Sequence, residues 1–202
     1  GYEAIGRFDS WEQIANYPVD NDRKGNRTVV PGDIMYKDQN NDGVINYLDE
    51  RPIGYRVDST PTLNFGINLS ASWKGFDLAM DWTGSGMTSW NQCYETARPF
   101  QNDGNSPDEV LKDAWHLSDI WDANSPLIPG KYPMVRLNTD ETSAYDKSSY
   151  WLHNVTYLKL RNLEVGYTFP KTWLNRTGIS NLRLFVSGTN LLTLSNLSVM
   201  DP

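Results

Sequence analysis

One acidic segment of this 202-residue chain carries the residue types of a metal-binding loop. Residues 38–49 place oxygen-bearing side chains at alternate positions, and calcium takes six to eight oxygen ligands. Gly43 permits the sharp turn of such a loop, Val44 offers a backbone carbonyl, and Ile45 is the apolar eighth residue. The pattern predicts a site for calcium or a similar hard cation, with the ligands Asp38, Asn40, Asp42, Val44, Asn46 and Asp49.

Two features limit this interpretation of the loop. The twelfth position is Asp49 instead of the usual Glu, so its carboxylate is shorter, and Glu50 is the alternative ligand. The flanking residues lack the pattern of long helices, so we expect an isolated loop with a structural role and not a paired sensor. The competing hypothesis is an acidic loop whose Asn and Asp side chains bond only its own backbone, as in Asx turns.

No catalytic constellation is evident in the sequence. The two histidines, His116 and His153, are far apart, and neither HExxH nor GxSxG occurs. Asp77 and Asp81 would share one strand face, but a glycosidase pair must lie about 5–9.5 Å apart across a cleft. The single cysteine, Cys93, excludes an internal disulfide. We therefore predict that the chain is not an enzyme and that calcium is its one cofactor.

Composition narrows the class of partner. The net charge of −7 argues against nucleic acid, because phosphates need a basic face. Aromatic residues make up 12% of the chain. Trp and Tyr suit boundaries where the ring contacts apolar groups and the polar N–H or O–H contacts water. No stretch approaches the roughly 18 consecutive apolar residues of a membrane helix. A membrane barrel stays possible, since its strands alternate, and so does a soluble, aromatic-rich β protein.

The clearest structural pattern is a hairpin. Residues 63–73 alternate strictly between apolar and polar, the pair Lys74-Gly75 signals a turn, and residues 76–83 alternate again. A strand that crosses a membrane needs about 9–11 residues, and the first strand is long enough. Trp73 and Trp82 lie toward the strand ends, where an aromatic girdle would place them.

Two further strands are expected at residues 157–169 and 181–190. Between the hairpin and these strands, residues 84–150 contain repeated Gly and Pro and no strand pattern, which predicts a long outer loop. Short helices are expected at residues 107–116, capped by Ser106, and after Ser10, with Gln13 completing a capping box.

A two-residue turn followed by a long loop is typical of outer-membrane barrels, which have short turns on one side and long loops on the other. The predicted fold class is therefore all-β. The chain would supply antiparallel strands of a large outer-membrane β-barrel with long extracellular loops, and that barrel is incomplete in this chain.

The motifs resemble those of the SusC/RagA-type TonB-dependent transporters of Bacteroidetes, in the same order along nearly the whole chain. The matching segments are PGDIMYKD at 31–38, RPIG at 51–54, WKGFDL at 73–78, the stretch 149–170 ending in YLKLRNLEVGYTFP, GIS at 178–180, and LRLFVSGTNLL at 182–192.

The resemblance implies an importer of nutrients, typically glycans and sometimes peptides, in the cell outer membrane. It implies a SusD-type surface lipoprotein over the barrel mouth, contact with the lipid bilayer, and TonB acting through an N-terminal box and a plug domain. Such a barrel has about 22 strands. Residues 1–202 would be its C-terminal part, without the plug and the final strand.

The aromatic residues of the predicted loops have two interpretations. In the barrel they would touch the lipoprotein or the substrate. In the alternative, a soluble, calcium-stabilised β-sandwich that binds carbohydrate, they would stack on pyranose rings. The residues concerned are Trp90, Trp115, Trp121 and Trp151.

Overall fold

The computed structural model describes residues 1–57, 60–101, 104–137, 142–175 and 178–197. The chain divides into two compact units. We call Gly1–Gly54 with Asn91–His153 the loop unit, and Tyr55–Trp90 with Asn154–Pro202 the sheet unit. Among the described residues, no helix has the length and apolarity needed to cross a membrane.

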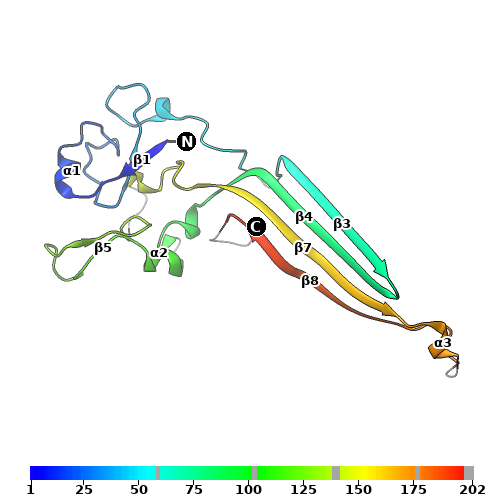
Figure 1. Cartoon of the computed structure of the whole chain (residues 1–202). Coiled ribbons are helices and arrows are strands. Elements are labelled where there is room, and N and C mark those ends of the chain that lie inside the picture. The colour runs from blue at the N-terminus through cyan, green and yellow to red at the C-terminus, as the bar shows by residue number, and fades with distance from the viewer. Residues whose placement is uncertain (58–59, 102–103, 138–141, 176–177, 198–202) are drawn as a thin grey trace. The chain divides into compact units, whose positions relative to one another are not determined.

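Four long strands lie side by side in the sheet unit (Figure 1), in the order β3-β4-β7-β8. These are β3 (Leu63–Trp73), β4 (Phe76–Asn91), β7 (Leu152–Thr168) and β8 (Arg183–Ser195), with the short helix α3 (Lys171–Leu174) between the last two. β3 pairs antiparallel with β4, and β7 pairs antiparallel with β8. The all-β, antiparallel expectation is confirmed.

The predicted hairpin is present in the expected register. Trp73 pairs with Phe76 across the turn, and the pairing continues without a shift to Leu63 and Gly86. The two turn residues, Lys74 and Gly75, have φ angles of 49° and 91°. Positive φ at both positions is the geometry of a type I′ turn, which matches the twist of paired strands.

The sheet has an apolar and a polar face. Directly paired residues share a face, so Leu69 and Met80 lie together, as do Ile67 and Trp82. The apolar face is unusually open: Leu69 is 48% exposed and Val186 is 78% exposed. Sheets that fold in water bury such a face, so these exposed fractions indicate that this face lies in an apolar environment.

Three strand boundaries differ from the sequence-based expectation. β4 continues past residue 83 to Asn91, so the predicted absence of strand after residue 83 is wrong. Gly84, interpreted as a breaker, lies inside the strand because the ring of Phe65 occupies the space where a Cβ would be, 2.1 Å from a ring atom. β7 begins at Leu152, earlier than expected, and β8 continues beyond Asn190, whose φ of 53° accompanies a shift in register.

The loop unit is a packed structure of short elements. Its N-terminal half contains β1 (Ala4–Arg7), α1 (Trp11–Ala15), β2 (Ile34–Tyr36) and the 3₁₀ helix η1 (Tyr47–Asp49). Its second segment contains η2 (Tyr94–Thr96), α2 (Asp108–Lys112), β5 (His116–Leu117), β6 (Leu127–Ile128) and η4 (Ser143–Tyr145).

Aromatic side chains form the centre of the loop unit. Trp151 is 2% exposed and stacks on Tyr145, with ring centroids 5.6 Å apart, and on Tyr132, 6.2 Å away. The indole N–H of Trp151 donates to the carbonyl of Ala144 at 2.9 Å. The segment expected as a long loop therefore includes a buried core, while its place outside the membrane stays a prediction.

The two helix predictions had different outcomes. Ser10 caps α1 by accepting from the N–H of Gln13 at 3.2 Å, as expected. The Gln13 side chain accepts from Asp9, one residue before the cap. Ser106 does not cap α2: Pro107 is the N-cap and makes no side-chain bond. α2 is also shorter than expected, because the backbone of Trp115 bonds Tyr132 instead of continuing the helix.

Candidate metal-binding loop and polar strand face

The acidic loop folds into a tight turn that its own side chains close. Both carboxylate oxygens of Asp38 accept backbone N–H bonds, from Asn41 at 2.7 Å and from Gly43 at 2.8 Å. Asn41 and Gly43 are in the left-handed region, with φ of 59° and 83°. Gly43 thus takes the turn conformation that the calcium-loop pattern requires.

The predicted ligands near the middle of the loop converge on Asp42. Its Oδ2 accepts from the side-chain amides of Asn40 at 2.8 Å and Asn46 at 3.4 Å. The Asn46 amide also donates to the carbonyl of Val44 at 3.1 Å. The N–H of Val44 and the amide of Asn40 hold the pKa of Asp42 below its ordinary value, since both bond its charged form.

Asp49 lies in a different environment from the other predicted ligands. Its side chain is fully buried, and its two oxygens accept the backbone N–H groups of Gln39 and Asn46, each at 2.8 Å. It therefore ties the beginning of the loop to its end. Glu50 turns elsewhere, with its carboxylate 3.8 Å from the amino group of Gly1.

The donor set fits a hard cation. The sequence-predicted ligands supply carboxylate, amide and carbonyl oxygens without sulfur or imidazole, which is the set that calcium prefers. Within the described ranges, no group of three or more His, Cys, Asp or Glu side chains gathers in a way that could hold a metal. A cation here would therefore depend on the oxygens of Asn40, Val44 and Asn46 as well as on carboxylates.

A backbone bridge joins the loop to the segment around Asp20, while the expectation of an isolated loop instead of a paired sensor stays a prediction. The N–H of Asp20 donates to the carbonyl of Gly43 at 2.8 Å, and the N–H of Ile45 donates to the carbonyl of Asp20 at 2.9 Å. Beside this bridge, the carboxylate of Asp22 accepts the backbone N–H of Lys24 at 2.8 Å. It also accepts the backbone N–H groups of Asn26 and Thr28. The sequence held no signal for the pairing, since residue 20 lies in a polar stretch without a motif.

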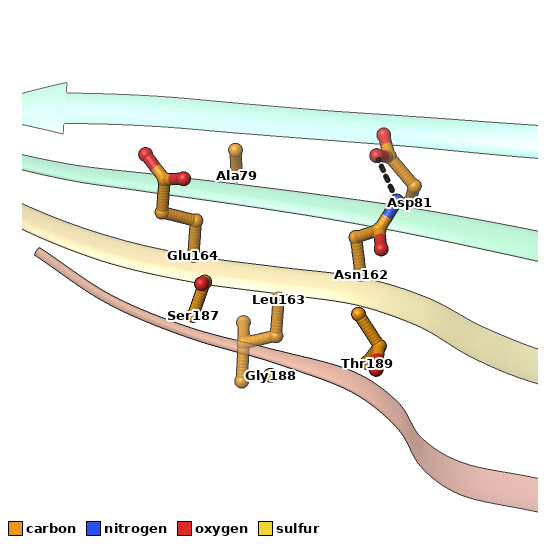
Figure 2. Close-up of a pocket in the computed structure, with 8 residues that line it drawn as sticks. All are labelled: Ala79, Asp81, Asn162, Leu163, Glu164, Ser187, Gly188 and Thr189. Atoms are coloured by element: carbon orange, nitrogen blue, oxygen red, sulfur yellow. Dashed lines mark hydrogen bonds between the residues drawn. The ribbon is translucent and has the colours of Figure 1, made fainter.

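The polar face of the sheet carries a second group of chemistry-bearing residues. A hollow of about 340 Å³ lies on this face, between β4, β7 and β8, and Figure 2 shows the residues that line it. Its polar lining comprises Asp81, Asn162, Glu164, Ser187 and Thr189. The Asn162 amide donates to Asp81 at 3.2 Å.

An ion cluster lies near this hollow. Arg183 on β8 bonds Asp77 on β4, with Nε to Oδ1 at 3.2 Å, and Glu164 on β7 at 2.5 Å. Gly166 leaves room for the ion pair between Asp77 and Arg183, because a Cβ at residue 166 would lie 2.6 Å from Asp77 Oδ2 and 2.5 Å from Arg183 Nη2. Asp77 and Asp81 therefore have separate partners, Arg183 and Asn162.

The comparisons with known proteins agree with these features. No family model matches the chain. Two TonB-dependent receptors of Formosa agariphila are 29% and 26% identical to it over 99% and 100% of its length. The chain covers 19% and 18% of these receptors, about a fifth of their length.

Solved structures show the same fold. The structure of the RagAB peptide transporter matches 97% of the chain and 19% of its own chain, with a TM-score of 0.57 and 20% identity. The closed-closed state of the RagAB peptide importer matches 96% of the chain and 19% of its own, with a TM-score of 0.56 and 19% identity.

The resemblance expected from the motifs is therefore confirmed, as is the outer-membrane localisation. Over its whole length, this chain is similar to part of the TonB-dependent receptors, and its antiparallel strands have the fold of the solved RagAB structures.

Proposed function

We propose that this chain is part of a TonB-dependent outer-membrane importer of oligomeric nutrients, glycans or peptides. One observation carries the proposal: the sheet exposes an apolar face and holds the ion cluster of Asp77, Glu164 and Arg183 on the opposite face. Strands of a membrane barrel alternate in this way, with apolar side chains toward lipid and polar ones toward the lumen.

The dimensions of the hairpin support a membrane-spanning role. β3 has 11 residues, and at about 3.3 Å per residue with a tilt of about 45° it would span about 25 Å. This equals the apolar band of such barrels, about 25 Å tall. Trp73 at the strand end is 70% exposed, a suitable position for an aromatic at the membrane interface.

Connectivity supports an outer-surface role for the second segment of the loop unit. β3 and β4 are joined by two residues, whereas residues 92–151 connect β4 to β7. Because outer-membrane barrels carry their long loops on the extracellular side, we assign this connection to the cell surface. A surface lipoprotein of the SusD type would contact it, and TonB would act on other parts of the receptor.

We also propose that residues 38–49 bind calcium in a structural role. A bound cation would be attracted to the carboxylates of the loop, so binding would stabilise the turn that is bridged to Asp20. Calorimetry on the intact receptor should show heat with millimolar calcium, and Asp42→Ala should abolish it. Equal heat of calcium binding in the variant would contradict the metal proposal and would leave the import proposal unaffected.

The import proposal is tested on the intact gene product in its own outer membrane. Uptake of labelled oligosaccharides or peptides should require the receptor and should stop when TonB is deleted, and the imported oligomers should be recovered uncleaved. An intact product that is soluble and monomeric without detergent would overturn the proposal and restore the carbohydrate-binding sandwich. Cleavage by the purified receptor would overturn the non-enzyme interpretation.

A further inference from the structure

A short hairpin in the loop unit holds two large apolar side chains in solvent. β5 and β6 pair through His116 with Ile128 and Leu117 with Leu127 (Figure 1). At its tip, Ile120 is 72% exposed and Trp121 is 90% exposed. Single exposed apolar residues are ordinary, but here two adjacent ones occupy one tip.

The base of the hairpin is anchored in the core. Trp115 is buried, and its backbone N–H donates to Tyr132 at 2.9 Å. Its ring lies against Gly32, where a Cβ would be 2.5 Å from a ring atom, and the guanidinium of Arg7 lies 5.6 Å from the ring centroid. A tip that extends from such a base is held in place.

The tip is also held by its own hydrogen bonds. Ser118 donates to the carbonyl of Pro126 at 2.9 Å, and Asp119 accepts the N–H of Trp121 at 2.9 Å. The hydroxyl of Ser125 accepts the N–H of Asp119 at 3.1 Å and donates to its carbonyl at 3.0 Å. Because the backbone around Trp121 is already ordered, binding through this residue would cost less conformational entropy.

We propose that Ile120 and Trp121 form a docking knob that inserts into an apolar pocket on a protein partner, and that basic side chains surround this pocket. Tryptophan is prominent among residues that dominate protein interfaces. The hairpin supplies the charge argument: residues 117–128 contain Asp119 and Asp122 and neither Lys nor Arg. An acidic tip is complementary to a basic rim. The inference rests on the proposed function, in which the partner is the surface lipoprotein.

A protein pocket fits the tip better than a sugar does. Ligand sites for small molecules are concave and surround their ligand with convergent polar groups. At 90% exposure, Trp121 lacks the walls that shield a ring in such a site. The adjacent aliphatic Ile120 gives no hydrogen bond to a hydroxyl, and both aspartates already accept backbone bonds within the turn.

Affinity between the intact receptor and its purified lipoprotein is the first test. Trp121→Ala should raise the dissociation constant by about 10-fold or more, and Ile120→Ala should raise it by a smaller factor. Trp11→Ala on α1 is the matched control, since Trp11 is also exposed, at 56%. An affinity of Trp121→Ala within twofold of the unchanged receptor overturns the inference. If that variant still imports normally, the proposed function stands without it.

A photo-crosslink identifies the occupant. A benzophenone side chain at Ala123, exposed on the tip, should label the lipoprotein at an apolar pocket near Lys or Arg. Crosslinks to the receptor's own chain would show that the knob packs within the receptor, and would overturn the inference. So would quenching of Trp121 fluorescence by soluble oligosaccharide alone, which would identify a sugar platform.

Discussion

The two units of this chain place aromatic side chains in opposite ways. In the loop unit, Trp151 is 2% exposed and stacked between tyrosines, whereas in the sheet unit Trp73 is 70% exposed at a strand end. One unit excludes water from its own core, as soluble proteins do. The other unit exposes its apolar face, which we assign to lipid. The apolar content of a segment therefore does not predict whether its apolar side chains are buried within the chain or exposed. The direction in which each side chain points decides this.

The largest effect is expected from the core of the loop unit. Trp151→Ala removes a fully packed indole and should lower the free energy of unfolding by about 3–5 kcal/mol. Protease cleavage within residues 91–153 of the intact receptor should then rise by about 100-fold or more. Trp73→Ala, in the sheet unit, should leave that cleavage rate unchanged. Equal protection of both variants would mean that the loop unit has no independent core.

A charge on the apolar face should have the next largest effect. Leu69→Lys places an ammonium among side chains assigned to lipid and should cost about 2–4 kcal/mol. Ser70→Lys, one residue along β3 and also exposed, points to the other face and should cost less than about 1 kcal/mol. The fraction of receptor that is folded in the outer membrane measures both. Equal losses would contradict the assignment of the two faces.

A smaller effect is expected on the polar face. Gly166→Ala forces a methyl group toward the carboxylate of Asp77 and the guanidinium of Arg183, and should cost about 1 kcal/mol or less, because both groups are the ends of flexible side chains that can shift. Gly66→Ala is the matched control on β3, where the nearest atom to the new Cβ would be 3.6 Å away. Thermal unfolding of the intact receptor in detergent compares the two. A control that loses as much would argue against the ion cluster.

The smallest effect at neutral pH concerns Tyr145. Burial raises the pKa of its phenol from 10.0 to about 12, and among the described side chains its hydroxyl is one of the buried atoms without a hydrogen-bond partner. Since the folded-state pKa is raised, stability from the neutral phenol is complete below pH 10 and is lost as pH rises toward about 12. Difference absorbance of tyrosinate should show several late-titrating groups, because burial also raises the pKa values of Tyr36 and Tyr150, and Tyr145→Phe should remove one of them. An unchanged titration would contradict this.

The sheet was predictable from sequence because its signal is local. The alternation in residues 63–73 and the turn at Lys74-Gly75 gave the hairpin and its register. The extension of β4 was missed because Gly84 is a breaker by propensity, and the cross-strand ring of Phe65 that covers it is not visible in a local window.

The loop unit was less predictable for the same reason. Tyr36, Tyr132 and Trp151 meet in the core but are separated by long stretches without periodicity. In the acidic loop, the spacing anticipated the meeting of Asn40, Asp42 and Asn46, whereas the bridge to residue 20 joins two segments that share no motif.

The most direct test of the central claim is a cysteine scan along β3 in the outer membrane, in a Cys93→Ser background. A spin label is placed in turn at residues 63–73, and its accessibility is measured to oxygen, which enters lipid, and to a polar nickel chelate, which stays in water. The account predicts strict alternation, with Leu63, Phe65, Ile67 and Leu69 accessible to oxygen and the residues between them to the chelate. Chelate accessibility at both sets of positions would contradict it.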